Sequence, residues 1–123
     1  MIPYRDATTI LVVEDDPAAR ELYRQVLLAA GFRAIAVPDG LDALKILETQ
    51  IPSLVVLDLI LPRVGGVDVY RELRARPDTR NVPVVIVTGS DVRELEPHMT
   101  QGFLRKPISP DALVSAVQHA VHT

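Results

Sequence analysis

Polar side chains of three chemical kinds follow apolar runs at four widely separated points of this chain. They are Glu14 with Asp15 and Asp16, then Asp58, Thr88 and Lys106. If the apolar runs are parallel strands, their carboxyl ends lie along one edge of a sheet, where open α/β folds place their ligand sites. We therefore expect acids, a hydroxyl and an ammonium group to meet in one pocket.

The acids of this expected pocket favour a divalent cation. Like charges about 4 Å apart repel by about 4 kcal/mol at an effective dielectric constant near 20, and Asp58 adds to the charge of the group that begins at Glu14. Either some acids are protonated, or they point into water, or a cation lies among them. Oxygen ligands without His or Cys suit Mg²⁺ or Mn²⁺ better than zinc.

Each of these residues also has an ordinary structural explanation. Asp16 precedes a proline and is most simply a helix N-cap. Asp58 could be a turn residue, and Thr88 could turn its hydroxyl to the backbone. Lys106 could be an exposed lysine, as most lysines are. These explanations would have to coincide along one edge of the sheet, which favours a shared pocket.

Apolar runs alternate with helical patterns, and this alternation is typical of βαβ units. The predicted strands are Ile10–Val13, Ala34–Val37, Leu54–Leu57, Val84–Val87 and a short one at Phe103-Leu104. Leu54–Leu57 is the most continuous apolar run, so we expect it at the centre of the sheet.

Helix start signals lie between these strands. Asp16-Pro17 and Ser109-Pro110 each combine a capping side chain with a proline at the first helical position. Asp39-Gly40 indicates a turn before a second helix, and a third helix is expected from about Val67. A further helix from Ser90 contains Pro97, which removes an interior hydrogen bond. The side chains expected to face the core include Ala18, Ala19, Leu22, Tyr23, Val26, Leu27, Ala30, Leu41, Leu44, Leu47, Val69, Tyr70, Leu73, Leu113, Ala116, Val117 and Ala120.

Length and composition indicate one domain. The 123 residues are expected to form a single unit over residues 1–123, with residues 1–8 as an N-terminal extension and no room for an output domain. A formal net charge of -3 argues against a nucleic-acid surface, and the absence of cysteine excludes disulfides and thiol catalysis. No apolar run suggests a signal peptide or a membrane span, so we expect a soluble cytoplasmic protein.

Four segments together resemble a known family. They are ILVVEDD (residues 10–16), LVVLDLILP (54–62), VVIVTG (84–89) and LRKP (104–107). They are similar to the receiver domain of bacterial two-component response regulators, and the resemblance extends from Ile10 to the end of the last helix. It implies a flavodoxin-like, doubly wound α/β fold, with five parallel strands in the order 2-1-3-4-5 and helices on both faces.

The resemblance also implies a role for each polar residue in the pocket. Asp58 would be the phosphoacceptor, taking a phosphoryl group from a histidine kinase or a histidine phosphotransfer protein. Mg²⁺, or Mn²⁺ in its place, would be held by Glu14, Asp15, Asp58 and the backbone carbonyl of Ile60. Lys106 would pair with the phosphoryl oxygens, and its peptide bond to Pro107 is expected to be cis.

A switch is implied as well. Thr88 would hydrogen-bond to a phosphoryl oxygen, and its movement would make room for the ring of Phe103, where the family often has a tyrosine. The surface that changes would comprise the helix from Ser90, the strand at Phe103-Leu104 and the last helix. The segment from Thr88 to Lys106 is shorter than the family leads us to expect.

Three functions from different classes fit these observations. The first is a stand-alone phosphoryl switch that acts between a kinase and an unknown downstream protein, as a monomer or weak homodimer, and is not an enzyme. The second is an adaptor of the same fold that works without phosphorylation. The third, a Mg²⁺-dependent hydrolase with an aspartyl-phosphate intermediate, would need its nucleophile on the first strand, whereas Asp58 follows the third.

Overall fold

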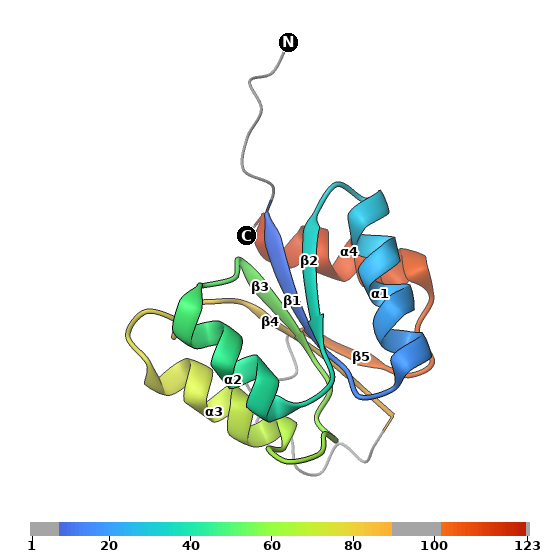
Figure 1. Cartoon of the computed structure of the whole chain (residues 1–123). Helices are drawn as coiled ribbons and strands as arrows, with labels where there is room; N and C mark the ends of the chain where they lie inside the picture. Colours follow the sequence, from blue (N-terminus) through green and yellow to red (C-terminus); the bar gives the residue numbers. More distant parts are fainter. Residues whose placement is uncertain (1–7, 90–101, 123) are drawn as a thin grey trace.

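Five strands and four helices make up the described part of the chain, which comprises residues 8–89 and 102–122 of a computed structural model (Figure 1). The strands are β1 (Thr9–Val13), β2 (Arg33–Val37), β3 (Leu54–Leu57), β4 (Val84–Thr88) and β5 (Phe103–Arg105). The helices are α1 (Pro17–Ala29), α2 (Gly40–Thr49), α3 (Gly66–Ala75) and α4 (Pro110–Val121). Each predicted strand is present, within one residue of its expected bounds.

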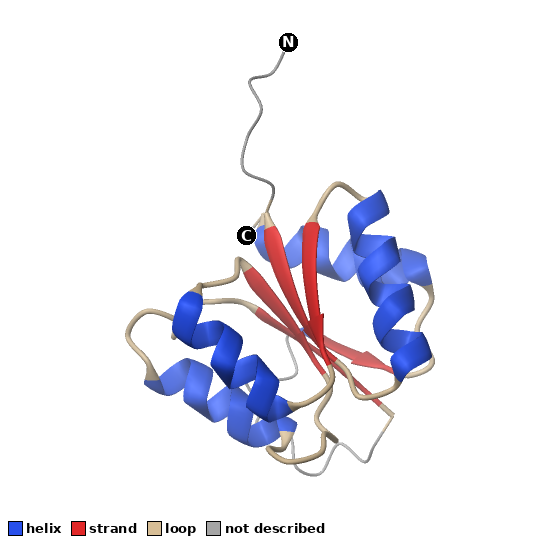
Figure 2. Cartoon of the chain, viewed as in Figure 1, coloured by secondary structure: helices blue, strands red, loops and turns tan. Residues whose placement is uncertain are grey.

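The strands form one parallel sheet in the order β2-β1-β3-β4-β5. This order confirms the fold class and the central position expected for β3. All strands point the same way, so the residues that follow them lie at a common edge (Figure 2).

Helices cover both faces of the sheet. Figure 1 shows α1 and α4 on one face and α2 and α3 on the other. Along β1, Leu11 and Val13 pack with the α2 and α3 side, whereas Ile10 and Val12 pack with the α1 and α4 side. Because both faces are covered, the central strands are apolar at every position rather than at every second one.

Side-chain caps fix where three helices begin. The backbone N–H of Ala19 donates to Asp16 Oδ2 at 2.8 Å, and that of Ala112 donates to Ser109 Oγ at 3.1 Å. These two caps confirm the sequence prediction. Asp39, predicted as a turn residue, also caps a helix, since its Oδ1 accepts from the N–H of Asp42 at 2.9 Å.

The buried face of α1 is narrower than its apolar pattern predicts. Tyr23 and Leu27 are buried as predicted, but Ala18 is exposed and Leu22 is 48% exposed. Leu22 lies at the border of the apolar stripe and lines a surface groove instead of the core. Of the other residues predicted to face the core, some are buried, namely Leu47, Val69, Tyr70, Leu73, Leu113 and Val117. The rest are half-buried, namely Ala19, Val26, Ala30, Leu41, Leu44, Ala116 and Ala120.

Some predictions fall outside the described residues. They are the helix from Ser90 with Pro97, and most of the N-terminal extension. Among the described helices, none combines the length and the hydropathy that a bilayer-spanning segment needs.

Candidate functional site

The polar residues singled out in the sequence lie at the carboxyl edge of the sheet. Glu14 follows β1, Asp58 follows β3, Thr88 ends β4 and Lys106 follows β5. The parallel topology therefore brings together residues that are far apart in sequence, as expected from their positions.

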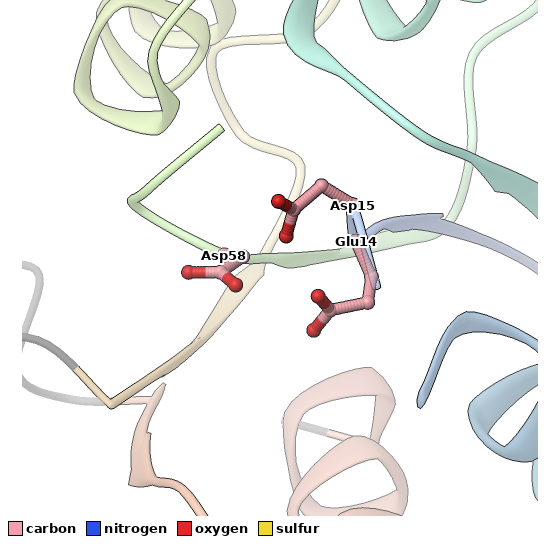
Figure 3. A group of neighbouring side chains, drawn as sticks. All are labelled: Glu14, Asp15 and Asp58. Carbon is pink, nitrogen blue, oxygen red and sulfur yellow. The ribbon is translucent and has the colours of Figure 1, made fainter. Parts of the chain in front are cut away.

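Three carboxylates form a cluster in this pocket. One ligand oxygen from each of Glu14, Asp15 and Asp58 lies within 4.8 Å of the others, and Figure 3 shows the three side chains around a common space. Glu14 is 1% exposed and Asp58 5%, whereas Asp15 is exposed. The cluster is thus closed on the protein side and open to solvent through Asp15.

Lys106 provides the countercharge within the pocket. Its Nζ donates to Asp58 Oδ2 at 2.8 Å and forms an ion pair with Glu14 Oε1 at 2.5 Å. Burial alone would lower the pKa of Lys106, but the hydrogen bonds and charges of Asp58 and Glu14 outweigh this effect and raise that pKa. The side chain of Lys106 is therefore a cation that joins the first and third strand ends.

The two carboxylate oxygens of Glu14 have different surroundings. Its Oε2 accepts from the backbone N–H of Asp16 at 3.1 Å. Its Oε1 is buried and, apart from the ion pair with Lys106, lacks a partner in hydrogen-bonding geometry among the described residues. Burial raises the pKa of Glu14 more than the contact with Lys106 lowers it, so the charged form of this side chain is less favourable here than in water.

The carboxylate of Asp58 is oriented by two different donors. The backbone N–H of Ile60 donates to Oδ1 at 3.1 Å, and Lys106 donates to Oδ2. The hydrogen bond from Ile60 also keeps the backbone of that residue beside the acid cluster, while its side chain is 58% exposed.

The loop after β1 holds its acids by local contacts. Asp16 caps α1 and is not one of the three clustered acids, which agrees with the interpretation from sequence. Arg20, in the first turn of α1, donates to the backbone oxygens of Glu14 at 3.2 Å and Asp15 at 3.4 Å. This arginine was missed in the sequence, where its spacing from the acids carries no specific signal.

The loop after β3 is held by a distant part of the chain. Arg63 Nε and Nη2 donate to Asp39 Oδ2 at 2.9 and 2.6 Å. Neither residue was selected from the sequence as part of the site, because they are 24 positions apart and belong to different loops. Arg63 lies in a loop between Pro62 and Gly65, and nothing in this local sequence indicates that it pairs with Asp39.

Thr88 and Phe103 lie on neighbouring strands. Thr88 is fully buried, and its backbone carbonyl accepts from the N–H of Lys106 at 3.0 Å. Phe103 is partly exposed, pairs with Ile86 in the sheet and packs against the core on the α2 and α3 side. The guanidinium carbon of Arg105 lies 5.9 Å from the centre of the Phe103 ring.

Two further predictions concern backbone geometry and histidine. The peptide bond between Lys106 and Pro107 is cis, as expected. His119 and His122 are exposed near the end of α4, away from the acid cluster, in agreement with their interpretation as solvated side chains. His98 lies outside the described residues.

Comparisons with known proteins agree with this geometry. The sequence model of the response regulator receiver domain matches residues 10–118. The polar-differentiation response regulator DivK of Brucella anthropi is 29% identical over 114 residues, which cover 89% of this chain and 93% of that protein.

Solved structures show the same similarity. A CheY-like response regulator receiver domain from Methylobacillus flagellatus is 32% identical with a TM-score of 0.80, covering 93% of this chain and 98% of that one. The receiver domain of a sensor histidine kinase from Pseudomonas aeruginosa, solved with a magnesium ion in its active-site cleft, is 27% identical with a TM-score of 0.83. That match covers 95% of this chain and 99% of the other. The strand order, the acid cluster and the family match lead to one conclusion: this chain belongs to the response regulator receiver domains of two-component signalling.

Proposed function

We propose that this domain is a phosphorylation switch in which Asp58 accepts a phosphoryl group from a phosphohistidine of a histidine kinase or phosphotransfer protein. An Asp58 oxygen would attack phosphorus, the phosphorus–nitrogen bond to the histidine would break, and an aspartyl phosphate would form. The observation that carries this proposal is the position of the Asp58 carboxylate, buried beside two other acids and contacted by Lys106.

The residues present suit a divalent cation. Glu14, Asp15 and Asp58 supply carboxylate oxygens, and the buried Glu14 Oε1 is contacted by the ammonium of Lys106 but by no donor in hydrogen-bonding geometry among the described residues. We assign Mg²⁺ to these three acids and the backbone carbonyl of Ile60, with Mn²⁺ as a substitute. When bound, the metal would offset negative charge on the phosphoryl oxygens.

Lys106 would act before and after transfer. In the unphosphorylated pocket its ammonium neutralises part of the charge of Glu14 and Asp58. A phosphoryl group on Asp58 carries oxygens with more charge than the carboxylate, and the ammonium of Lys106 is within reach to pair with them. Its raised pKa keeps it protonated throughout the neutral range.

The switch would run from the phosphoryl group to β5. We assign the hydroxyl of Thr88 to a phosphoryl oxygen, and the ring of Phe103 to the rearrangement that follows. The backbone hydrogen bond from Lys106 to Thr88 and the pairing of β4 with β5 couple these residues. The responsive surface would include β5, α4 and the segment from Ser90, and its downstream partner would be a protein that distinguishes the two states.

The phosphodonor would approach beside Lys106. A surface groove there is mainly apolar, and Leu22 contributes an exposed side chain to it. The groove is lined by Asp16, Ala19, Leu22, Tyr23, Lys106, Pro107 and Ile108. Such a surface gives a donor protein apolar contact next to the phosphoacceptor. We expect this exchange to take place in the cytoplasm, with the domain as a monomer or weak homodimer.

The decisive experiment replaces the phosphoacceptor. Wild-type protein should be labelled by acetyl phosphate in the presence of Mg²⁺, and Asp58→Asn should abolish the label while the circular dichroism spectrum stays unchanged. Asp16→Asn is the matched control, because it removes a neighbouring acid but keeps a side chain that can cap α1. Label that persists in Asp58→Asn, or is absent from the wild type, would remove the assignment.

A further inference from the structure

The loop after Asp58 reaches across to the start of α2. Arg63 donates to Asp39 Oδ2 through Nε and Nη2, and its Nη2 also contacts Asp42 Oδ1 at 3.2 Å. The backbones touch at the same place, since a Cβ added at Gly40 would lie 2.1 Å from the backbone oxygen of Val64. The loop is therefore fixed to α2 by both side-chain and backbone contacts.

Arg63 adopts a backbone conformation that needs support. Its φ is 67°, and the N–H of Val64 donates to the carbonyl of Pro62 at 2.8 Å, which closes a three-residue turn around it. Such turns with positive φ are rare and strained, and residues other than glycine seldom occupy them. Strained positions persist where surrounding contacts determine them, and here the guanidinium of Arg63 contacts Asp39 and, at a longer distance, Asp42.

Asp39 is well suited to hold the arginine in place. Its side chain is 8% exposed, and its Oδ1 is already occupied by the N–H of Asp42 as the cap of α2. That hydrogen bond, together with the pairing to Arg63, lowers the pKa of Asp39 below its ordinary value. Arg63 thus meets an ionised carboxylate whose position is set by a helix end.

The same loop leads directly to the acid cluster. Ile60 lies three positions before Arg63, and its N–H donates to Asp58 Oδ1. The base of the loop is closed by Gly66, whose N–H donates to the carbonyl of Leu59 at 3.0 Å. Ile60 therefore lies in a loop that is held at two places, by the hydrogen bonds near Asp58 at one end and by the contact of Arg63 with Asp39 further along.

We propose that Arg63 is a positioning residue for the divalent-cation site: its bond to Asp39 holds the loop that presents the backbone oxygen of Ile60 to the metal. Arg63 does not touch the metal or the phosphoryl group in this proposal and acts through the loop. The inference rests on the proposed function, because it requires that the acid cluster binds Mg²⁺.

The charge of Arg63 makes this proposal sharply testable. If the arginine acted only as a nearby positive charge, its removal would strengthen the binding of a cation. If it positions the loop, its removal weakens that binding because a ligand is less well placed. The two explanations predict opposite signs for one measurement.

The test measures Mg²⁺ binding to unphosphorylated protein by titration calorimetry, without any phosphodonor. We expect Arg63→Gly, which tolerates the positive φ, to raise the dissociation constant about tenfold, the lower end of the effect of losing a supporting contact. Asp39→Asn keeps a capping oxygen for α2 but loses the charge that holds Arg63, and should act similarly. The double variant should bind Mg²⁺ as weakly as either single variant, because each single substitution already removes the contact between Arg63 and Asp39.

A matched control and a second readout separate positioning from a general loss of stability. Arg76→Ala removes an ion pair with Glu72 at the other end of α3, with the same change in net charge, and should leave Mg²⁺ affinity unchanged. In metal-free protein, the amide NMR signal of Ile60 should shift in Arg63→Gly and in Asp39→Asn but not in Arg76→Ala.

The outcomes that would overturn the proposal are distinct. Mg²⁺ binding by Arg63→Gly that is as tight as in the wild type, or tighter, would show that the arginine does not position the metal site. Additive effects in the double variant would show that Arg63 and Asp39 do not act through their shared contact. Should Arg63→Gly fail to fold, Arg63→Asn carries the same test, because it removes the same positive charge and also tolerates a positive φ. A wild-type protein that does not bind Mg²⁺ would instead refute the metal site of the proposed function.

Discussion

The loops after β1 and after β3 supply acids to the same pocket but are stabilised in different ways. The first, residues 14–16, passes directly into α1 and is shaped mainly by contacts with its own neighbours in sequence, besides the ion pair of Glu14 with Lys106 and the hydrogen bond from the Glu14 N–H to the carbonyl of Val37. The second, residues 58–65, is longer, and its conformation depends on the contact of Arg63 with Asp39 and on the packing of Val64 against the start of α2. One pocket is therefore built from a locally determined half and a half that requires the rest of the fold.

This difference decides what a substitution can do. In the first loop, a lost contact removes a cap or a side-chain hydrogen bond and leaves the chain path unchanged. In the second, backbone packs on backbone, so an added methyl group must displace a chain segment. The predictions below test this contrast in order of decreasing expected effect.

The largest effect is expected at the base of the second loop. A Cβ at Gly66 would lie 2.2 Å from the backbone oxygen of Asp58, so Gly66→Ala should lower the free energy of unfolding by about 3 kcal/mol in urea titrations. Gly65→Ala is the control, because the nearest atom to its added Cβ is 3.9 Å away and the change should stay within about 1 kcal/mol. Equal effects of both substitutions would mean that the backbone contact does not constrain the loop.

A moderate effect is expected in the first loop. Asp16→Ala removes the acceptor for the N–H of Ala19 and should cost about 1 kcal/mol of unfolding free energy. Asp16→Ser, which retains a capping oxygen, should recover most of this loss. A serine variant as unstable as the alanine variant would show that the cap is not what stabilises this loop.

The pH dependence of stability should report the charge of Glu14. Its pKa is raised above the ordinary 4.5 in the folded protein, so the folded state holds this proton more tightly than the unfolded state. The contribution of Glu14 to the unfolding free energy therefore falls as pH rises above 4.5 through the folded-state pKa. Because glutamine does not titrate, the unfolding free energy of Glu14→Gln should lack this decrease with rising pH.

The measurement is urea unfolding of both proteins with a chelator present, at about pH 4 and about pH 7. The stability of Glu14→Gln relative to the wild type should increase towards the higher pH. A difference that stayed constant, or changed in the opposite direction, would contradict the assigned shift of the Glu14 pKa.

The smallest effect on stability is expected at Arg63, where substitution should weaken Mg²⁺ binding but hardly change the free energy of unfolding. The arginine side chain is 50% exposed, so its ion pair with Asp39 contributes about 1 kcal/mol at most. Asn tolerates a positive φ better than Arg, which offsets part of that loss. We expect Arg63→Asn to change the unfolding free energy by no more than about 0.5 kcal/mol, and a loss of several kcal/mol would assign the residue to stability instead.

The locally determined half of the pocket is also the half that could be predicted from sequence. Asp16-Pro17 carries its cap signal within a few residues, and the apolar run of β3 indicates its central place without any other information. The shared edge followed from the parallel strands, and the strand order from the family resemblance.

What the sequence could not provide depends on contacts between distant segments. Asp39 gave a correct signal for a turn, but its pairing with Arg63 follows from how α2 and the second loop pack. Leu22 was placed in the core because apolar periodicity does not reveal how wide a helix face the neighbouring elements cover. The roles of Thr88 and Phe103 in switching remain predictions.

Gly40 and Gly66 begin helices, yet both are required by the loop that passes beside them. At each position a methyl group would meet backbone atoms of that loop, Val64 in one case and Asp58 in the other. During divergence of related sequences, a side chain at either position would have to be accompanied by a new path for residues 59–65. These two glycines are therefore markers, readable in any related sequence, of whether the loop after Asp58 follows the course described for this chain.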